Sequence, residues 1–474
     1  MAVASFLFTM ASPRLSAQEV TVYVSSKAGD RLALKPALRF GPRRQTNLPV
    51  FRVNDQERDR TIVGFGASFL EAGMICLSSL PLARQEEVLR KLFGPERGAG
   101  FSAMKTVIGA TDFMSAGPFY TYDETPGDVE MKHFSIARDL GPNGLITFIK
   151  RARTYGRFVL QAPMDYPPDW MLYDVKRRQD VDPEYFDALA RYYLCYLRQY
   201  AEHGVFVDYL SLFNEPGVYT KINYAEILDL LKNHVGPLLQ KEGIKTKIQL
   251  SEAPTRENAY HNCPTVLDDP AARQYIAALP YHGYDWKNPR SYEEIAELHK
   301  RYPDLPLWMT EVCHAYEVGD PKTMPIPRYD FEDGDFWGNV IMSDLNAGAA
   351  GWTYWNTILD EKGGPWKVSV VHEDPEPNIQ HPVVIVNRKT HKVTYTGLYY
   401  YLAHFSKFVR PGEVRIGITG SASGVRCVAF QKPKGGHVAE LINSSNKDVP
   451  VQLNSGDRAL TVNLPALSIT TLLW

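Results

Sequence analysis

The amino-acid sequence predicts an α/β protein: a (β/α)8 TIM barrel with an attached antiparallel β-sandwich domain. Three observations favour this fold. Eight short apolar segments, most of them followed by a helical pattern, occupy the middle of the chain. After Lys407 the pattern changes to short strands of alternating polarity. The 474 residues also exceed the needs of one ordinary core, and they suit a barrel of roughly 250 residues or more plus a second module.

The predicted barrel strands are nearly continuous runs of hydrophobic residues, which is typical of parallel strands buried on both faces. Parallel neighbours need helical crossovers, so the alternation indicates a parallel barrel. The alternative is a doubly wound open sheet, which typically has a glycine-rich phosphate loop after an early strand. The chain has neither GxGxxG nor GxxxxGK(S/T), which disfavours this alternative. The strands are expected at Thr61–Ser68, Gly100–Gly109, Arg157–Met164, Val207–Pro216, Lys247–Ala253, Leu279–Tyr284, Leu305–Val312 and Ala349–Trp355.

Start and stop signals mark the helices between these strands. Asp182 followed by Pro183 supplies a capping residue and a first-turn proline. Ser291 with Glu294 three residues on has the spacing of a capping box. Pro237 is a candidate break within its helix. Helices are expected at Leu80–Phe93, Asp182–Gly204, Asn223–Gly243 and Ser291–Tyr302.

The two ends of the chain are expected to share the β-sandwich. Strand patterns in residues 410–474 are separated by Gly, Asn and Pro, and Val20–Phe40 also has the pattern of a strand. That domain would then be discontinuous. The predicted division is residues 1–17 as a signal peptide, 18–60 as N-terminal sandwich strands, 61–409 as the catalytic barrel and 410–474 as the C-terminal sandwich. The C-terminal strands include Val425–Gln431, His437–Asn443 and Ala459–Leu464.

Composition excludes some classes of partner. The net charge is −2 and the pI about 6.6, so no basic surplus attracts nucleic acid or anionic lipid. Aromatic residues make up 12%, with 27 Tyr and 8 Trp. Such rings suit either sugar stacking or core packing.

The first residues read as a secretory signal, which predicts a secreted or periplasmic protein. Ala2–Met10 is a short apolar run, and Leu15–Ala17 ends in a small residue before Gln18. The run is too short to span a bilayer, and no later run of about 20 apolar residues follows. The five cysteines are dispersed and odd in number, and without a CxxC pair they predict neither a dense disulfide framework nor a zinc site.

Two carboxylates stand at the ends of predicted strands. Glu215 lies in Leu-Phe-Asn-Glu-Pro at the end of the fourth strand, and Glu311 lies in Trp-Met-Thr-Glu-Val at the end of the seventh. Barrel active sites form at the carboxyl ends of the strands. A lone strand-end Glu is more often a salt-bridge partner, but two such residues on these strands point to a site.

Two carboxyl groups about 5–5.5 Å apart perform retaining glycoside hydrolysis, in which one attacks the anomeric carbon and the other protonates the leaving oxygen. The acid must keep its proton near neutral pH, and both burial and a neighbouring negative charge favour this. We therefore expect Glu215 to be the acid/base and Glu311 the nucleophile, with Asn214 beside the sugar 2-hydroxyl.

From Val63 to Trp474 the chain resembles glycoside hydrolase family 30, and its glucosylceramidase-like branch in particular. The Asn-Glu-Pro motif alone is shared with many related barrel families, whereas its combination with the later segments is more specific. The matching segments are Gly64–Ser68, Asn214–Pro216, Gly351–Asn356, Gly363–Pro365 and His404–Phe408. The resemblance implies a barrel with a sandwich built from both chain ends, retention of anomeric configuration, and no metal or organic cofactor.

The resemblance also implies roles for individual residues. Glu215 is again the acid/base and Glu311 the nucleophile. Asp112 matches a carboxylate that binds sugar hydroxyls, against the simpler reading of a helix cap. The remaining matches are Tyr284 as a hydrogen-bond partner of Glu311, Trp355 as the aromatic floor of the sugar subsite, His282 as either a site residue or a satisfied strand histidine, and Cys313 as a small packing residue.

Two positions depart from the family pattern. The family commonly has Arg where this chain has Lys105, and Trp where Asp165 aligns. Lys is a point charge without the planar fork of Arg, and Asp replaces a stacking face by a hydrogen-bond acceptor. If Lys105 and Asp165 face the same subsite, they are candidates to pair. The glycone is then not plain glucose, or it is held differently.

The function predicted is an exo-acting β-glucosidase of glucosylceramidase type. Its substrate would be a small β-glycoside or oligosaccharide, glycolipids included. Met114–Asn143 and His372–Gln380 are expected to wall the barrel mouth, which favours a pocket and short substrates. The alternatives within the family are β-xylosidase, β-1,6-glucanase and β-fucosidase or galactosidase. Outside it stand a non-catalytic carbohydrate-binding relative, which would lose a carboxylate, and a metal-dependent barrel hydrolase, which would need clustered His and Asp ligands.

Overall fold

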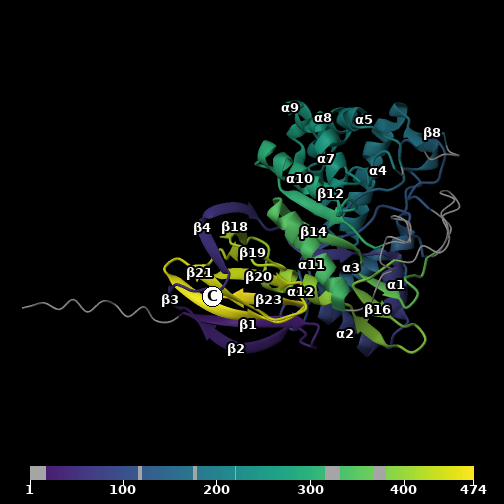
Figure 1. Ribbon diagram of the computed structural model, residues 1–474. Coiled ribbons are helices and arrows are strands. Elements are labelled where there is room, and N and C mark those ends of the chain that lie inside the picture. The colour runs from purple at the N-terminus through teal and green to yellow at the C-terminus, as the bar shows by residue number, and fades with distance from the viewer. Residues whose placement is uncertain (1–17, 116–119, 175–178, 219, 315–330, 367–379) are drawn as a thin grey trace, which may run out of the picture.

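The computed structural model describes residues 18–474 apart from 116–119, 175–178, 219, 315–330 and 367–379. Two packed bodies are visible in Figure 1: a barrel ringed by helices, and a strand-rich domain built from both ends of the chain. The predicted signal peptide, and the predicted mouth segment at residues 372–379, lie outside the described residues.

Eight parallel strands close into a barrel, which confirms the predicted fold class. The order around the barrel follows the order along the chain, with β14 closing onto β5. All eight predicted strand regions overlap one of these strands. They are β5 (Gly64–Ser68), β6 (Ala103–Lys105), β7 (Val159–Ala162), β10 (Tyr209–Ser211), β11 (Lys247–Gln249), β12 (Ile276–His282), β13 (Leu307–Glu311) and β14 (Ala349–Asn356).

Helices connect these strands and cover the barrel (Figure 1). They pack apolar faces against the strands, as Val88, Leu89, Leu92 and Phe93 do in the second helix. The helices are α1 (Glu71–Ser78), α2 (Leu82–Phe93), α3 (Leu145–Arg153), α4 (Phe186–Glu202), α5 (Tyr224–Asp229), α6 (Gly236–Lys241), α7 (Arg256–Asn262), α8 (Pro264–Leu267), α9 (Pro270–Arg273), α10 (Pro289–Arg301), α11 (Phe331–Asn346) and α12 (Gly397–Phe408). Short 3-10 turns lie at Ala137–Leu140, Asp169–Met171 and Pro183–Tyr185.

Two helix predictions are corrected by the structure. The capping box expected at Ser291 is wrong, because α10 begins earlier, at Pro289, with Asn288 as its cap. Asn288 Oδ1 accepts a hydrogen bond from the Arg290 amide at 3.1 Å, so an Asn-Pro start outcompetes the later serine. Pro237 does not break its helix: a π-helical turn, Leu230–Val235, directly precedes α6 and accommodates the proline, which has no N–H to donate.

The second body is a ten-stranded sheet shared by the two chain ends. In Figure 1 the purple strands β1 and β2 lie beside the yellow strand β23. Val20–Phe40 forms two strands rather than one, because a turn with Gly29 at φ 118° separates them. The pairing is antiparallel except between β4 and β21. The strands are β1 (Glu19–Ser26), β2 (Ala33–Arg39), β3 (Gly41–Pro42), β4 (Val50–Thr61), β18 (Val414–Thr419), β19 (Val425–Gln431), β20 (His437–Asn443), β21 (Val449–Ser455), β22 (Arg458–Leu464) and β23 (Ser468–Leu473).

One hydrophobic core runs from the barrel into this sheet. It includes Phe65 of the barrel, Phe405 of α12 and Ile442 of β20, all fully buried. Small sheets complete the chain: β15 (Ile358–Asp360), β16 (Val384–Val386) and β17 (Val393–Tyr395), and the pair β8 (Leu172–Asp174) and β9 (Gln179–Val181). Among the described residues, no helix is long and apolar enough to cross a membrane. All five cysteines are free thiols.

Candidate active site

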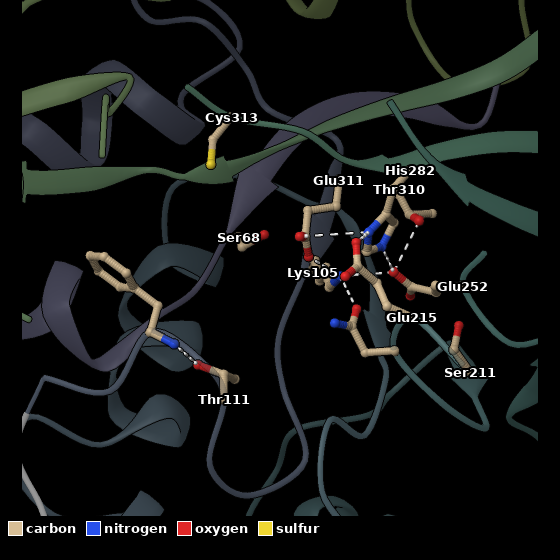
Figure 2. A network of polar contacts seen from close by, with 12 residues as sticks. Ser68, Lys105, Thr111, Ser211, Glu215, Glu252, His282, Thr310, Glu311 and Cys313 are labelled. Atoms are coloured by element: carbon tan, nitrogen blue, oxygen red, sulfur yellow. Dashed lines mark hydrogen bonds and ion pairs between the residues drawn. The ribbon is translucent and has the colours of Figure 1, made fainter. Parts of the chain in front are cut away.

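The predicted site residues gather at the carboxyl ends of the barrel strands, where barrel enzymes build their sites. Figure 2 shows the centre of this cluster, in which Lys105, Glu215, Glu252, His282 and Glu311 converge from different strands. Lys105 ends β6, His282 ends β12 and Glu311 ends β13. Trp355 lies next to the last residue of β14. The other predicted residues lie in the segments that follow barrel strands: Asp112, Asp165, Asn214, Glu215 and Tyr284.

Glu215 and Glu311 lie close together. One oxygen of each carboxylate and one ring nitrogen of His282 lie within 4.8 Å of one another. Both residues are largely buried, at 6% and 5% exposure. The strand ends therefore bring together two carboxylates that are 96 positions apart in the sequence.

Glu215 occupies a strained backbone conformation. Its φ is 44°, in the left-handed region that side chains other than glycine rarely adopt. The conformation is held from both sides: the Glu215 amide donates to the Glu252 carbonyl at 2.9 Å, and the Val218 amide donates to the Glu215 carbonyl at 3.0 Å. This geometry fixes the direction of the carboxyl group before any substrate binds.

Lys105 is a completely buried cation that links two carboxylates. Its Nζ lies 2.6 Å from Glu311 Oε2 and 2.7 Å from Glu252 Oε2, and it donates to Asn214 Oδ1 at 3.1 Å. Burial opposes its charge, but the two carboxylates outweigh burial and raise the pKa of Lys105. Lys105 is thus charged throughout the physiological range and stabilises the ionised form of Glu311.

Glu252 is a central residue that sequence reasoning missed. It is fully buried, and its Oε2 accepts hydrogen bonds from Lys105, from His282 Nε2 at 2.9 Å and from Thr310 Oγ1 at 3.0 Å. Burial opposes ionisation, yet Lys105 and His282 outweigh it and lower the pKa of Glu252 to about 2. The signal was available, because Glu252 stands at the end of a predicted strand just as Glu215 and Glu311 do.

His282 joins the two sides of the cluster. Its Nδ1 lies 2.7 Å from Glu215 Oε1 and its Nε2 lies 2.9 Å from Glu252 Oε2. Burial alone would lower its pKa, but the surrounding carboxylates, Glu311 first, outweigh burial and raise the pKa of His282 to about 9. A protonated imidazole donates from both nitrogens, which fits a carboxylate on each side.

The environment of Glu215 favours its protonated form. Burial raises the pKa of Glu215, and the negative charge of Glu311 raises it further, while the contact with His282 opposes the rise. Glu311 has the opposite surroundings. Lys105 lies against one of its oxygens, and the hydroxyl of Tyr284 donates to the other at 2.9 Å. The two carboxylates of the pair therefore have different surroundings: Glu311 faces a cation and a hydroxyl donor, whereas burial raises the pKa of Glu215.

The remaining predicted residues surround this pair. Trp355 is 2% exposed, and its ring lies 5.0 Å from Lys105 Nζ. Asp112 caps none of the described helices, and it is half-buried. Its backbone carbonyl accepts a hydrogen bond from Trp366 Nε1 at 3.3 Å. Cys313 is buried, with its sulfur 3.8 Å from the Tyr284 hydroxyl.

The predicted pairing of Lys105 with Asp165 is wrong. Lys105 forms ion pairs with Glu252 and Glu311, and Asp165 makes no hydrogen bond through either carboxyl oxygen. The physical reason is the unforeseen Glu252, which supplies a closer buried counter-charge for the lysine. Asp165 nevertheless belongs to the same cluster of charged residues, because the charges of Asp112, Lys105, Glu311 and Glu215 all act on its pKa.

Removal of the buried cation should destabilise the fold. We expect Lys105→Met to lower the free energy of unfolding by about 3–5 kcal/mol, since Glu252 and Glu311 would lose the buried cation that they share and only His282 would remain beside them. Urea unfolding at pH 7 measures this loss. The control is Lys389→Met at an exposed lysine, which should change stability by less than about 0.5 kcal/mol. Equal stability of the two variants would contradict the network.

His282 should impose a pH dependence on stability. Its pKa rises from 6.5 to about 9 on folding, so its contribution is complete below pH 6.5 and is lost as the pH rises from 6.5 through 9. In the wild type, the free energy of unfolding should fall by on the order of 2 kcal/mol between pH 6.5 and pH 9 because of His282, and in His282→Gln this fall should be absent. Urea unfolding at pH 6.5 and pH 9 tests this, with His203→Gln at an exposed histidine as control. An unchanged slope in His282→Gln would refute the assignment.

A closed (β/α)8 barrel with two neighbouring carboxylates at its strand ends is the architecture of a glycoside hydrolase. Comparison with known proteins gives the particular family. The model described as the glycosyl hydrolase family 30 TIM-barrel domain matches residues 62–409, and the family 30 β-sandwich domain matches residues 412–472. The chain belongs to glycosyl hydrolase family 30.

Individual relatives agree over nearly the whole length. Lysosomal acid glucosylceramidase of Mus musculus is 24% identical over 471 residues, which cover 95% of this chain and 88% of the mouse protein. Endo-1,6-beta-D-glucanase of Neurospora crassa is 28% identical, covering 84% of this chain and 82% of the fungal protein. The crystal structure of SrfJ from Salmonella typhimurium has a TM-score of 0.86 at 20% identity, covering 96% and 99% of the two chains, and it shows the fold alone.

Proposed function

We propose that the protein is a retaining β-glycoside hydrolase that works by double displacement, with Glu311 as the nucleophile and Glu215 as the acid/base. The observation that carries the proposal is the approach of the two carboxylates, one oxygen of each lying within 4.8 Å of the other. Retaining enzymes hold their carboxyl groups about 5–5.5 Å apart, whereas inverting enzymes leave about 6.5–9.5 Å for a water molecule.

The surroundings divide the roles. A nucleophile must be ionised, and Lys105 and Tyr284 both stabilise the charge of Glu311. An acid must hold a proton near neutral pH, and burial together with the charge of Glu311 raises the pKa of Glu215. In the first step Glu311 attacks the anomeric carbon while Glu215 protonates the departing oxygen.

The same electrostatics reverse the role of Glu215 in the second step. Once Glu311 is esterified by the sugar, its negative charge is gone, and one of the causes that raise the pKa of Glu215 disappears. His282 then favours the ionised form of Glu215. Glu215 is thereby ready to take a proton from the water that hydrolyses the intermediate.

Other residues would bind the sugar. Asn214 Oδ1 is occupied by Lys105, which leaves its Nδ2 to donate to the 2-hydroxyl. Trp355 would supply an indole face for the sugar ring, and Asp112 would supply acceptors for its hydroxyl groups. The roles of Trp355 and Asp112 match those that the family resemblance implies for the same positions.

For the substrate we propose a β-glucoside cleaved from the chain end, as in a glucosylceramidase. The support is the similarity to the mouse glucosylceramidase along nearly the full chain. An endo-acting β-1,6-glucanase is the second candidate, because the Neurospora crassa relative with that name is comparably similar.

An activity panel separates these candidates. Aryl β-glycosides with different glycones, glucosylceramide in detergent, and a long β-1,6-glucan would be compared by kcat/KM. Turnover of aryl β-glucosides and glucosylceramide with little release from the polymer is expected. Rapid shortening of the polymer, with poor aryl glycoside hydrolysis, would favour the endo-acting alternative, and inactivity toward every β-glycoside would refute the proposed function.

A further inference from the structure

Asp165 is a buried acid without a partner. It is 1% exposed, and neither carboxyl oxygen makes a hydrogen bond. Burial of a polar group that stays unpaired costs stability. Such a cost is typical of a group kept for a ligand that completes its hydrogen bonds.

The backbone around Asp165 is firmly held. The Ile108 amide donates to the Pro163 carbonyl at 2.9 Å, and the Asn214 amide donates to the Met164 carbonyl at 2.8 Å. The Thr220 hydroxyl donates to the carbonyl of Asp165 itself at 2.8 Å. Neighbouring barrel segments on both sides therefore fix this turn, and the carboxyl group is placed in advance of binding.

The carboxyl group of Asp165 belongs to the cluster of charged residues at the strand ends. Burial raises its pKa well above the usual range, and the charges of Asp112, Glu311 and Glu215 raise it further, against the opposing effect of Lys105. A carboxyl group that keeps its proton offers one O–H donor as well as acceptor positions. Sugar hydroxyl groups, each both donor and acceptor, complement this set.

We propose that Asp165 is a specificity-determining residue that binds a hydroxyl group of the glycone. The proposal rests on the proposed β-glycosidase function. It assigns to Asp165 a hydrogen-bonding role at a position where the family resemblance leads one to expect a stacking tryptophan. The chain would thus select its glycone by a directional contact rather than by an aromatic face.

A cycle of enzyme and substrate variants tests the proposal. The aryl β-glycoside that the wild type hydrolyses fastest is compared with its 3-deoxy, 4-deoxy and 6-deoxy analogues. We expect Asp165→Ala to lower kcat/KM on the parent substrate by about tenfold to a hundredfold. On one deoxy analogue, the one lacking the bound hydroxyl, the same substitution should have an effect of less than about threefold. An equal loss on all analogues would overturn the proposal.

Asp165→Asn and thermal unfolding complete the test. Asn keeps a donor and an acceptor without charge, so its kcat/KM on the parent should exceed that of Asp165→Ala; equal impairment of the two would show that charge is what matters and would overturn the proposal. Both variants should unfold at the wild-type temperature or higher, because they remove an unpaired buried acid. A lower Tm would indicate a structural role instead. A wild type that cleaves no β-glycoside refutes the proposed function rather than this inference.

Discussion

Glu311→Gln is expected to lower kcat/KM on aryl β-glycosides by at least about 10⁴-fold while leaving the protein folded. The amide cannot form the glycosyl ester, so the first displacement is lost. Its shape is kept, and it can still accept a hydrogen bond from Tyr284. Steady-state kinetics with a chromogenic substrate measure the loss, and thermal unfolding verifies the fold.

A buried glutamate outside the cavity provides the matched control. Glu294 on α10 is 5% exposed and pairs with Arg290. We expect Glu294→Gln to retain kcat/KM within about twofold, since an ion pair with a surface arginine contributes little to the stability of the fold. Residual activity in Glu311→Gln above a few percent of wild type, after exclusion of contaminating wild type, would contradict its assignment as the nucleophile.

Glu215→Gln is expected to lower kcat/KM by about 10² to 10⁴-fold, with a loss that depends on the leaving group. A dinitrophenolate leaves without a proton, so its glycoside should lose much less than a glycoside with an alkyl leaving group. The alkaline limb of the pH profile should also disappear, because it reports the deprotonation of the acid. A loss independent of the leaving group would argue against Glu215 as the acid.

Added azide distinguishes the two carboxylates by stereochemistry. In Glu215→Ala, azide can enter beside the missing base and attack the glycosyl ester, which gives the β-glycosyl azide. In Glu311→Ala, azide can occupy the position of the missing nucleophile and displace the leaving group directly, which gives the α-glycosyl azide. Identification of the product anomer by NMR assigns each residue, and reversed products would exchange the roles.

The barrel and its two main carboxylates could be predicted because their signals are local. Buried parallel strands leave continuous apolar runs in the sequence, and Glu215 and Glu311 stand out as charges at the ends of such runs. The N-terminal strands of the second domain were also visible as a strand pattern. Their division by the turn at Gly29 was missed, although Ser25, Ser26, Gly29 and Asp30 are turn-type residues and mark it in the sequence.

The ion pairs of the site could not be predicted in the same way. Lys105 pairs with Glu252 and Glu311 because five strand ends meet within one small volume, and partners in such a cluster are chosen by distances that sequence spacing does not encode. Because the sequence did not single out Glu252, Asp165 was the expected partner for Lys105. The structure shows that the carboxyl oxygens of Asp165 make no hydrogen bond. The proposal on sugar specificity depends on this observation, which requires the positions of all its neighbours.

The anomeric configuration of the first-formed sugar tests the central claim most directly. Hydrolysis of an aryl β-glycoside would be followed by proton NMR with enough enzyme to finish before mutarotation. Two displacements at the anomeric carbon, by Glu311 and then by water, predict that the β-anomer appears first and the α-anomer only later. Initial appearance of the α-anomer would show a single displacement and would contradict the covalent role of Glu311.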